Sequence, residues 1–408
     1  MKKFKTKLSA LVVTALATGA ANAYDLDLGK GHTISFHGFL SQGYLVSDEY
    51  NYLGQTTDDG SFQFTEIGLN ASYSPFERTR IAVQGFAFDV GDIGNLEPFL
   101  DYASLEYTFS DYFGLRGGRV RRPGGIYNHI QDVDLARTSV LLPQGMYDAR
   151  WRDFSTSVDG AVAFGNVSVA KAGSVSYEAF AGMMNVSMDG GVASLLKGSL
   201  PPGATLDDIP QSPMAGAQLW WNTPISGLRA GAMLGQVFDF GYEVTAFSPF
   251  VGTINLDTEG DIFVQQYSLE YLWKAWTFQL EYYTYNFRNQ TVQQNAILGT
   301  STTSDKSIPD TWYVSAAYRF NKWLEVGTYY TEFYADVHDR DGSSMATPSD
   351  AFQKDVALSF RFDPLDWWII KLEGHYIRGT ALLRDNVSNP IRNDDGWWLF
   401  GVKTTVSF

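Results

Sequence analysis

Residues 276–283 have the sequence WTFQLEYY, and this stretch decides the fold class because its polarity alternates with a period of two residues. Its even-numbered positions carry Trp, Phe, Leu and Tyr, whereas its odd-numbered positions carry Thr, Gln, Glu and Tyr. Successive side chains of a β-strand point to opposite faces, so the pattern predicts a strand with one apolar and one polar face. The segments 354–362, 368–376 and 400–408 repeat the alternation.

Short and long connections alternate between such strands. Seven tight turns are expected at 74–77, 110–112, 171–173, 223–225, 274–275, 321–322 and 363–365. Eight longer, polar connections are expected at about 46–61, 91–98, 122–153, 186–211, 239–260, 289–309, 335–351 and 379–395. Fifteen connections join sixteen strands, and the last strand is expected to pair with the first one, near residues 32–45.

Amphipathic strands suit either a soluble sandwich or propeller, or a transmembrane antiparallel barrel whose apolar face meets lipid. The regular difference between short turns and long connections favours the barrel, as does a last strand with one largely apolar face that ends on Phe408. Several tryptophans also flank the short turns, as in the aromatic girdle of a membrane barrel. These are Trp220, Trp221, Trp273, Trp276, Trp323, Trp367 and Trp368. Sixteen strands enclose an aqueous channel.

Composition excludes several classes of protein. The 408 residues include 45 acidic and 30 basic ones, a formal net charge of −15, and no cysteine. The missing cysteines exclude disulfide scaffolds, cysteine-ligated zinc and thiol catalysis. The acidity argues against a nucleic-acid partner, which requires a basic face. Charged residues make up only 18% of the chain, so much of its surface is expected not to face water.

Residues 1–23 are typical of a secretory signal peptide. Four lysines precede an apolar stretch from Leu8 to Ala17, and Ala21-Asn22-Ala23 forms a small-residue cleavage site. The expected mature chain, 24–408, keeps 26 basic and 45 acidic residues, a net charge of −19. It contains no later apolar run of about 18 residues that a transmembrane helix requires.

The chain resembles the Gram-negative outer-membrane porins. The resemblance rests on the signal, the alternating strands, the rhythm of turns and loops, and the terminal Val406-Ser407-Phe408. Residues 118–128 (GRVRRPGGIYN) and 141–147 (LLPQGMY) resemble a porin subgroup related to the phosphate-selective type. The chain departs from that subgroup in being acidic and poor in lysine.

The resemblance implies an all-β fold: a sixteen-stranded up-and-down barrel whose third long loop, about 122–153, folds into the lumen. It also implies a homotrimer in the outer membrane of a Gram-negative bacterium, in contact with the lipid bilayer and lipopolysaccharide. In that family a C-terminal aromatic residue, here Phe408, is part of the signal that the barrel-assembly machinery recognises.

The pore constriction is expected where charges gather in and near residues 122–153. Its candidate residues are Arg80, Arg116, Arg119, Arg121, Arg122, Tyr127, Asp132, Asp134, Arg137, Arg150 and Arg152. Acidic residues on polar strand faces are expected to line the lumen: Glu66, Glu106, Glu270, Glu281, Glu325 and Glu373. The alternatives are that the arginines only hold the barrel's shape, that the loop acids are ordinary solvated charges, and that Tyr127 is a packing residue.

The leading functional hypothesis is a water-filled porin for passive diffusion of ions and small hydrophilic solutes, with a weak cation preference from its excess of acids. A substrate-selective channel for phosphate, other anions or sugars, using the arginine cluster, is the alternative. A third hypothesis, a barrel enzyme, would require a nucleophile, a base and an orienting acid, and no such set is recognised. No cofactor is expected, and the five histidines show no metal-ligand spacing.

Overall fold

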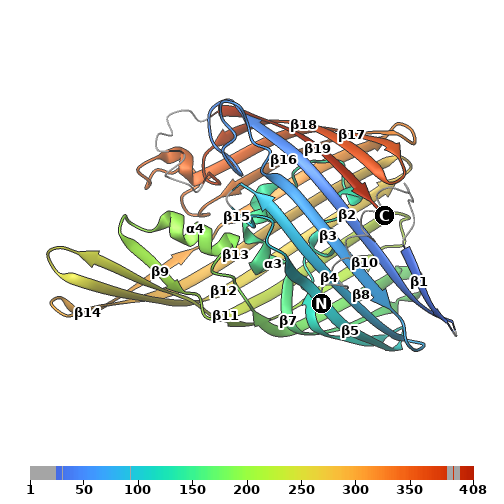
Figure 1. Ribbon diagram of the computed structural model, residues 1–408, viewed down its shortest axis with the longest axis horizontal. Helices are drawn as coiled ribbons and strands as arrows, with labels where there is room; N and C mark the ends of the chain where they lie inside the picture. The colour runs from blue at the N-terminus through green and yellow to red at the C-terminus, as the bar shows by residue number, and fades with distance from the viewer. Residues whose placement is uncertain (1–23, 30, 92, 384–388, 390–395) are drawn as a thin grey trace, which may run out of the picture.

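The structure is a computed structural model that describes residues 24–29, 31–91, 93–383, 389 and 396–408. The expected signal peptide, 1–23, lies outside the described residues. Sixteen strands of the described part form one closed antiparallel barrel, so the predicted fold class is confirmed (Figure 1). In chain order they are β2 (His32–Ser47), β3 (Phe64–Tyr73), β4 (Thr79–Val90), β5 (Phe99–Ser110), β6 (Phe113–Arg121), β7 (Ser157–Ser168), β8 (Ser174–Met184), β10 (Ser212–Asn222), β11 (Leu228–Ser248), β12 (Gly252–Trp273), β13 (Trp276–Asn295), β15 (Asp310–Arg319), β16 (Leu324–Tyr334), β17 (Phe352–Leu365), β18 (Trp368–Gly379) and β19 (Gly396–Ser407).

The barrel closes as the sequence predicts, because β19 pairs with β2 and places Val402 opposite Tyr44. Closure pairs the backbone groups of both strands, which an open sheet edge in hydrocarbon would leave unsatisfied at several kcal/mol each. The short strand β1 (Tyr24–Gly29) forms a hairpin with the start of β2, outside the cylinder.

The alternation places apolar side chains outside and polar ones inside. On β18, Leu372 and Tyr376 are exposed on the outer face, whereas Lys371, Glu373 and His375 are buried on the inner face. The other barrel strands also expose large apolar side chains. Examples are Ile67, Leu105, Leu219, Leu269, Leu280, Val314, Leu358 and Val402. This outer surface has the composition that contact with lipid requires.

The two rims differ, as expected, but three predicted connections are wrong. The long connection predicted at 289–309 is mostly paired strand, because β13 continues to Asn295 and residues 299–307 pair with it. The turn predicted at 363–365 lies two to three residues later, because β17 continues to Leu365, which pairs with Trp368. The long connection predicted at 239–260 is instead a hairpin, since β11 and β12 remain paired up to Ser248 and Gly252. Polar composition suggested a loop there, but backbone pairing does not require an apolar face.

Two further strands extend this hairpin into a sheet beyond the barrel. Strand β9 (Ala204–Asp208) pairs with β11, and β14 (Gly299–Ser307) pairs with β13. The sheet projects from the long-loop rim, at the left of Figure 1. No helix of the described ranges has the length and apolar character needed to cross a membrane.

The few helical segments lie in the connections. The connection from β6 to β7 contains η1 (Asn128–Ile130), η2 (Asp134–Ala136), α2 (Gln144–Tyr147), η3 (Ala149–Trp151) and α3 (Arg152–Ser155). Elsewhere are η4 (Ala170–Ala172), η5 (Pro348–Ala351) and α4 (Gly191–Ser199), the last on the connection from β8 to β10.

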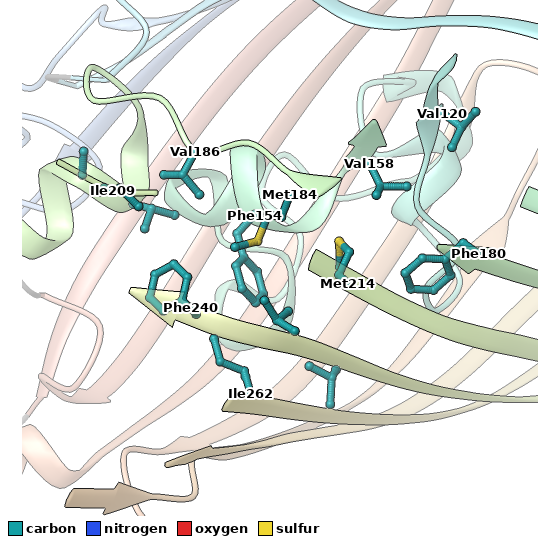
Figure 2. Packing of buried hydrophobic residues seen from close by; sticks show 14 of the residues in the cluster. Val120, Phe154, Val158, Phe180, Met184, Val186, Ile209, Met214, Phe240 and Ile262 are labelled. Atoms are coloured by element: carbon teal, nitrogen blue, oxygen red, sulfur yellow. The ribbon is translucent and has the colours of Figure 1, made fainter. Parts of the chain in front are cut away.

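A buried apolar cluster lies inside the barrel near the long-loop rim. It joins Phe154 of α3 to Met184, Met214, Phe240 and Ile262 of the neighbouring strands and connections. Figure 2 shows Phe154 beside Phe240, and their ring centroids are 6.5 Å apart. Part of the inner wall is therefore apolar and shielded from water. A lumen lined only by polar side chains would have no such region.

Candidate functional site

The connection from β6 to β7, residues 122–156, crosses the interior of the barrel. It contains the predicted constriction segment, 122–153, and is called the constriction loop below. Two contacts far apart on the wall establish this position. The amide of Ile126 donates to Glu281 on β13 at 3.0 Å, and the amide of Val140 donates to Glu373 on β18 at 2.8 Å. Because both glutamates lie on the inner face, the loop spans the lumen between them.

A buried ion-pair network holds the first part of the loop against β5 and β6. Asp132 pairs with Arg121 and Arg152, and Asp101 of β5 binds the same two arginines at 2.5 and 2.9 Å. Gln84 of β4 donates to both carboxylates. Burial alone would raise the pKa of Asp132, but the two arginines hold it well below its usual range. Two acids and two arginines therefore neutralise each other.

A second network surrounds Asp134. Its carboxylate lies 2.9 Å from Lys403 of β19, 3.4 Å from Lys371 of β18 and 2.9 Å from Arg137 of the loop. Thr405 donates to the same group at 2.6 Å. Burial opposes ionisation of Asp134, but these three cations lower its pKa far below the usual value. One loop carboxylate therefore compensates several buried cations of loop and wall.

Two wall glutamates act as hydrogen-bond acceptors for the loop. Glu281 accepts from Ile126 N and from the hydroxyls of Tyr147 and Tyr313. Glu373 accepts from the amides of Val140 and Leu141, each at 2.8 Å. Both side chains are buried. The carboxylates thus satisfy backbone donors that would otherwise be stranded inside the barrel.

Most of the remaining candidate arginines also have partners. Arg116 pairs with Glu106 at 2.7 Å, Arg119 with Asp159 at 3.2 Å, and Arg150 with Asp148 at 2.6 Å. Arg122 donates to the carbonyl of Ser155 at 2.7 Å.

Three further candidates complete the placement. Arg80 is exposed near the short-turn end of β4. Tyr127 donates its hydroxyl to Gln279 at 2.7 Å, and Glu66 pairs with Lys403. The structure therefore gives most of the predicted arginines a carboxylate or carbonyl partner.

A polar cavity of about 220 Å³ lies between the loop and the wall formed by β12 to β17. Arg137 of the loop and Arg361 of β17 contribute positive charge to its lining, and Glu270 of β12 and Glu325 of β16 contribute negative charge. Arg361 also donates to the carbonyl of Leu135 at 2.6 Å. Four of the predicted residues, Tyr127, Arg137, Glu270 and Glu325, meet in this lining.

The opposite side of the loop is apolar. Phe154 and Trp151 pack with their ring centroids 5.7 Å apart, and Val192 and Leu196 of α4 belong to the same cluster. Asp153 is an acid within this side, next to the first turn of α4. Burial raises its pKa to about 6, although backbone amides of Val192 and Ser187 oppose the rise.

Sequence reasoning missed four charged residues of the site: Asp101, Arg361, Lys371 and Lys403. The last three occupy inward positions of alternating strands, so the two-residue period combined with charge would have found them. Asp101 lies where the pairing of β4 and β5 shifts register, between Gln84 and Gly85. No signal in the sequence marks that irregularity.

Comparison with solved structures gives the same fold throughout the chain. OmpT, an outer membrane protein of Vibrio cholerae, matches with a TM-score of 0.57 and 14% identity over 95% of this chain and 100% of that one. OmpF of Salmonella typhi, in complex with daunomycin, matches with a TM-score of 0.55 and 11% identity, over 94% of this chain and 100% of that one. An anion-selective porin from Comamonas acidovorans matches with a TM-score of 0.52 and 11% identity, over 92% of this chain and 100% of that one.

The fold is therefore that of the sixteen-stranded outer-membrane porins, and the predicted resemblance is confirmed at the level of architecture. Identities this low carry the fold alone. No family model matches the sequence, and no curated protein matches it either.

Proposed function

We propose that the chain is an outer-membrane porin of a Gram-negative bacterium, through which ions and small hydrophilic solutes diffuse passively. The observation that carries the proposal is the polar cavity between the constriction loop and the wall of a closed sixteen-stranded barrel. A barrel of this size has room for an aqueous passage, and a loop inside it narrows that passage.

The charges around the cavity supply the sieving mechanism. The lining brings the positive charges of Arg137 and Arg361 close to the negative charges of Glu270 and Glu325, and together they create a local field in the passage. Low-dielectric walls focus such a field. Polar solutes align their dipoles with it, whereas apolar solutes must displace water that it orders.

A weak cation preference follows from the charge balance. The whole chain has 45 acidic and 30 basic residues. Arg121 and Arg152, the strongest candidates for an anion site, are each bonded to two carboxylates. This neutralisation favours a general channel over a phosphate-selective or other anion-selective one.

Assembly is part of the same proposal: a homotrimer in a lipid bilayer, with its long loops toward lipopolysaccharide. Phe408 is bonded through its backbone N and O to Gly38 of β2, at 3.0 and 3.1 Å. The terminal residue thus lies at the seam where the last strand meets the first. That position suits a terminal signal read by the barrel-assembly machinery.

Reversal potentials across a planar bilayer in a salt gradient test the proposal. The wild-type channel is expected to favour cations weakly, and the pair Glu270→Gln and Glu325→Gln is expected to shift the potential toward anion preference. Asp305→Asn, on the exposed strand β14 far from the cavity, is the matched control and leaves it unchanged. Clear anion selectivity of the wild type would overturn the preference, and absence of conductance would overturn the channel.

A further inference from the structure

A second, larger cavity lies on the apolar side of the constriction loop. Its volume is about 410 Å³, and it is lined by the loop, α4, strands β11 to β13, β16, η5 and the connection that follows β18. Eight aromatic side chains line it: Trp151, Phe154, Phe240, Tyr242, Tyr283, Tyr285, Phe287 and Phe333. Figure 2 shows part of this wall, with Phe154, Phe240 and Ile262 close together. The cavity is separate from the polar one, which has a different lining.

The dimensions suit a small ring compound. A dry apolar cavity of about 150 Å³ accommodates benzene, and ligand sites commonly measure about 300–1,000 Å³. A volume of about 410 Å³ therefore has room for two fused rings. The wall rings already contact each other edge to face, as with Phe240 and Phe287 at 6.2 Å. An aromatic guest would extend the same packing.

One polar group of the lining indicates a further feature of the guest. Gln144 is only 6% exposed and donates its Nε2 to the carbonyl of Leu142 at 2.6 Å. Its Oε1 is buried and has no hydrogen-bond partner among the described residues. A buried acceptor without a donor is unfavourable, because it has lost its hydrogen bond to water. A guest with a hydroxyl or N–H group would remove that cost.

Charge limits the class of guest. Asp350 is the charged residue among the described lining, and Thr380 donates to it at 2.6 Å. The other lining groups are apolar, aromatic or neutral polar. Moving an ion from water into such a wall is unfavourable, so a neutral molecule fits best.

We propose that this cavity is a binding site for a neutral aromatic molecule of about two fused rings that carries one hydrogen-bond donor. The site goes beyond the proposed diffusion channel, in which solutes pass without being bound. Ring faces pack against the aromatic wall, and the donor group of the guest bonds to Oε1 of Gln144.

Calorimetric titration with 2-naphthol tests the site, using the full-length mature protein in lipid nanodiscs. Leu195→Trp fills the cavity from α4, whereas Ser194→Trp places the same side chain on the exposed side of that helix. Saturable binding is expected for the wild type and for Ser194→Trp, with at least tenfold weaker binding for Leu195→Trp. Equal uptake by all three proteins would show only partition into lipid and would overturn the site.

A second titration isolates the role of Gln144. The ligand 2-methoxynaphthalene lacks the donor hydrogen and is expected to bind the wild type about fivefold more weakly than 2-naphthol does. Gln144→Leu is expected to bind the two ligands equally. A preference for 2-naphthol that survives in Gln144→Leu would overturn the assigned hydrogen bond.

Conductance of the same samples separates this inference from the proposed function. A conducting wild-type channel that binds no 2-naphthol contradicts only the binding site. Saturable binding by a protein that does not conduct contradicts only the channel.

Discussion

The two sides of the constriction loop are attached to the barrel by different physics. On one side, Asp132 and Asp134 anchor the loop through buried ion pairs to β6, β18 and β19. On the other side, Phe154 and Trp151 anchor it through apolar packing against α4 and the inner wall. The first attachment is directional and the second is not.

The difference explains how a charged loop remains fixed inside a wet barrel. Ion pairs set the position of individual residues, but each buried charge depends on its partner. Apolar packing tolerates small shifts but loses free energy with every cavity that forms. The charged side therefore defines the register of the loop along the wall, and the apolar side adds stability without fixing that register.

The largest effect is expected from Asp134→Asn. Removing this carboxylate leaves Lys371, Lys403 and Arg137 close together with less compensation. Breaking a buried pair costs about 3–5 kcal/mol, so the free energy of unfolding should fall by about that amount. Urea unfolding measures the change, and single-channel recordings should show noisier current from a loosened loop. Adding Lys371→Met should restore part of the lost stability; no restoration would contradict the network.

The apolar side is tested by Met184→Ala. Met184 is fully buried in the apolar cluster, and truncation of such a side chain costs about 2–5 kcal/mol. Met183→Ala, at the adjacent position on the other face of β8, is the matched control and should cost clearly less. Urea unfolding of the two variants gives the comparison. Equal losses would mean that the cluster does not stabilise the loop.

Asp153 makes the apolar side sensitive to pH. Its pKa of about 6 lies above that of an unfolded aspartate, so the folded state binds more protons between about pH 4 and pH 6. Stability should therefore fall as pH rises through this range, by about 3 kcal/mol at most. Asp153→Asn should remove this dependence and stabilise the protein at pH 7.5 but not at pH 4. Hydrogen exchange of the α4 amides, followed as a function of pH, measures this change in stability.

The charged side should respond in the opposite sense, and only at lower pH. The depressed pKa values of Asp132 and Asp134 mean that their stabilisation is present above the pKa of an unfolded aspartate. It is lost only as pH falls through the lower folded values. A loss of the loop's attachment already at pH 5 in Asp153→Asn would contradict this assignment.

The smallest effect is expected from Glu106→Gln. Its pair with Arg116 is about one-fifth exposed on each side, so water screens it. Such pairs contribute about 0–1 kcal/mol, and the unfolding midpoint should hardly move. A loss comparable to that of Asp134→Asn would remove the distinction between buried anchors and partly exposed pairs.

The sequence predicts the walls of this molecule better than its interior. The alternation in 276–283 correctly separates outward Phe278 and Leu280 from inward Gln279 and Glu281, because strand geometry imposes a two-residue period. The count of turns and connections also predicts the sixteen strands, and the pairing of the last strand with the first is predicted as well. The hairpin at 239–260 was missed because cross-strand pairing, unlike burial, leaves little trace in composition.

The interior depends on long-range partners that no local pattern reveals. The sequence indicates that Arg121 and Asp132 lie near the constriction, but it does not reveal Asp101, the second carboxylate on Arg121, which lies at an irregular register of β5. The dry part of the inner wall was also missed. Phe180 and Met184 face inward, where a polar lumen was expected, because the loop and α4 cover them.

Cysteine accessibility during conductance tests the central claim most directly, because the chain contains no cysteine of its own. Ser315→Cys lies in the lining of the polar cavity, and Val314→Cys lies one position away on the exposed outer face. A charged, membrane-impermeant thiol reagent is expected to react with Ser315→Cys and reduce its single-channel current, and to leave the current of Val314→Cys unchanged. An unaltered current after confirmed labelling of Ser315→Cys, or a block through Val314→Cys, would contradict a water-filled passage beside the constriction loop.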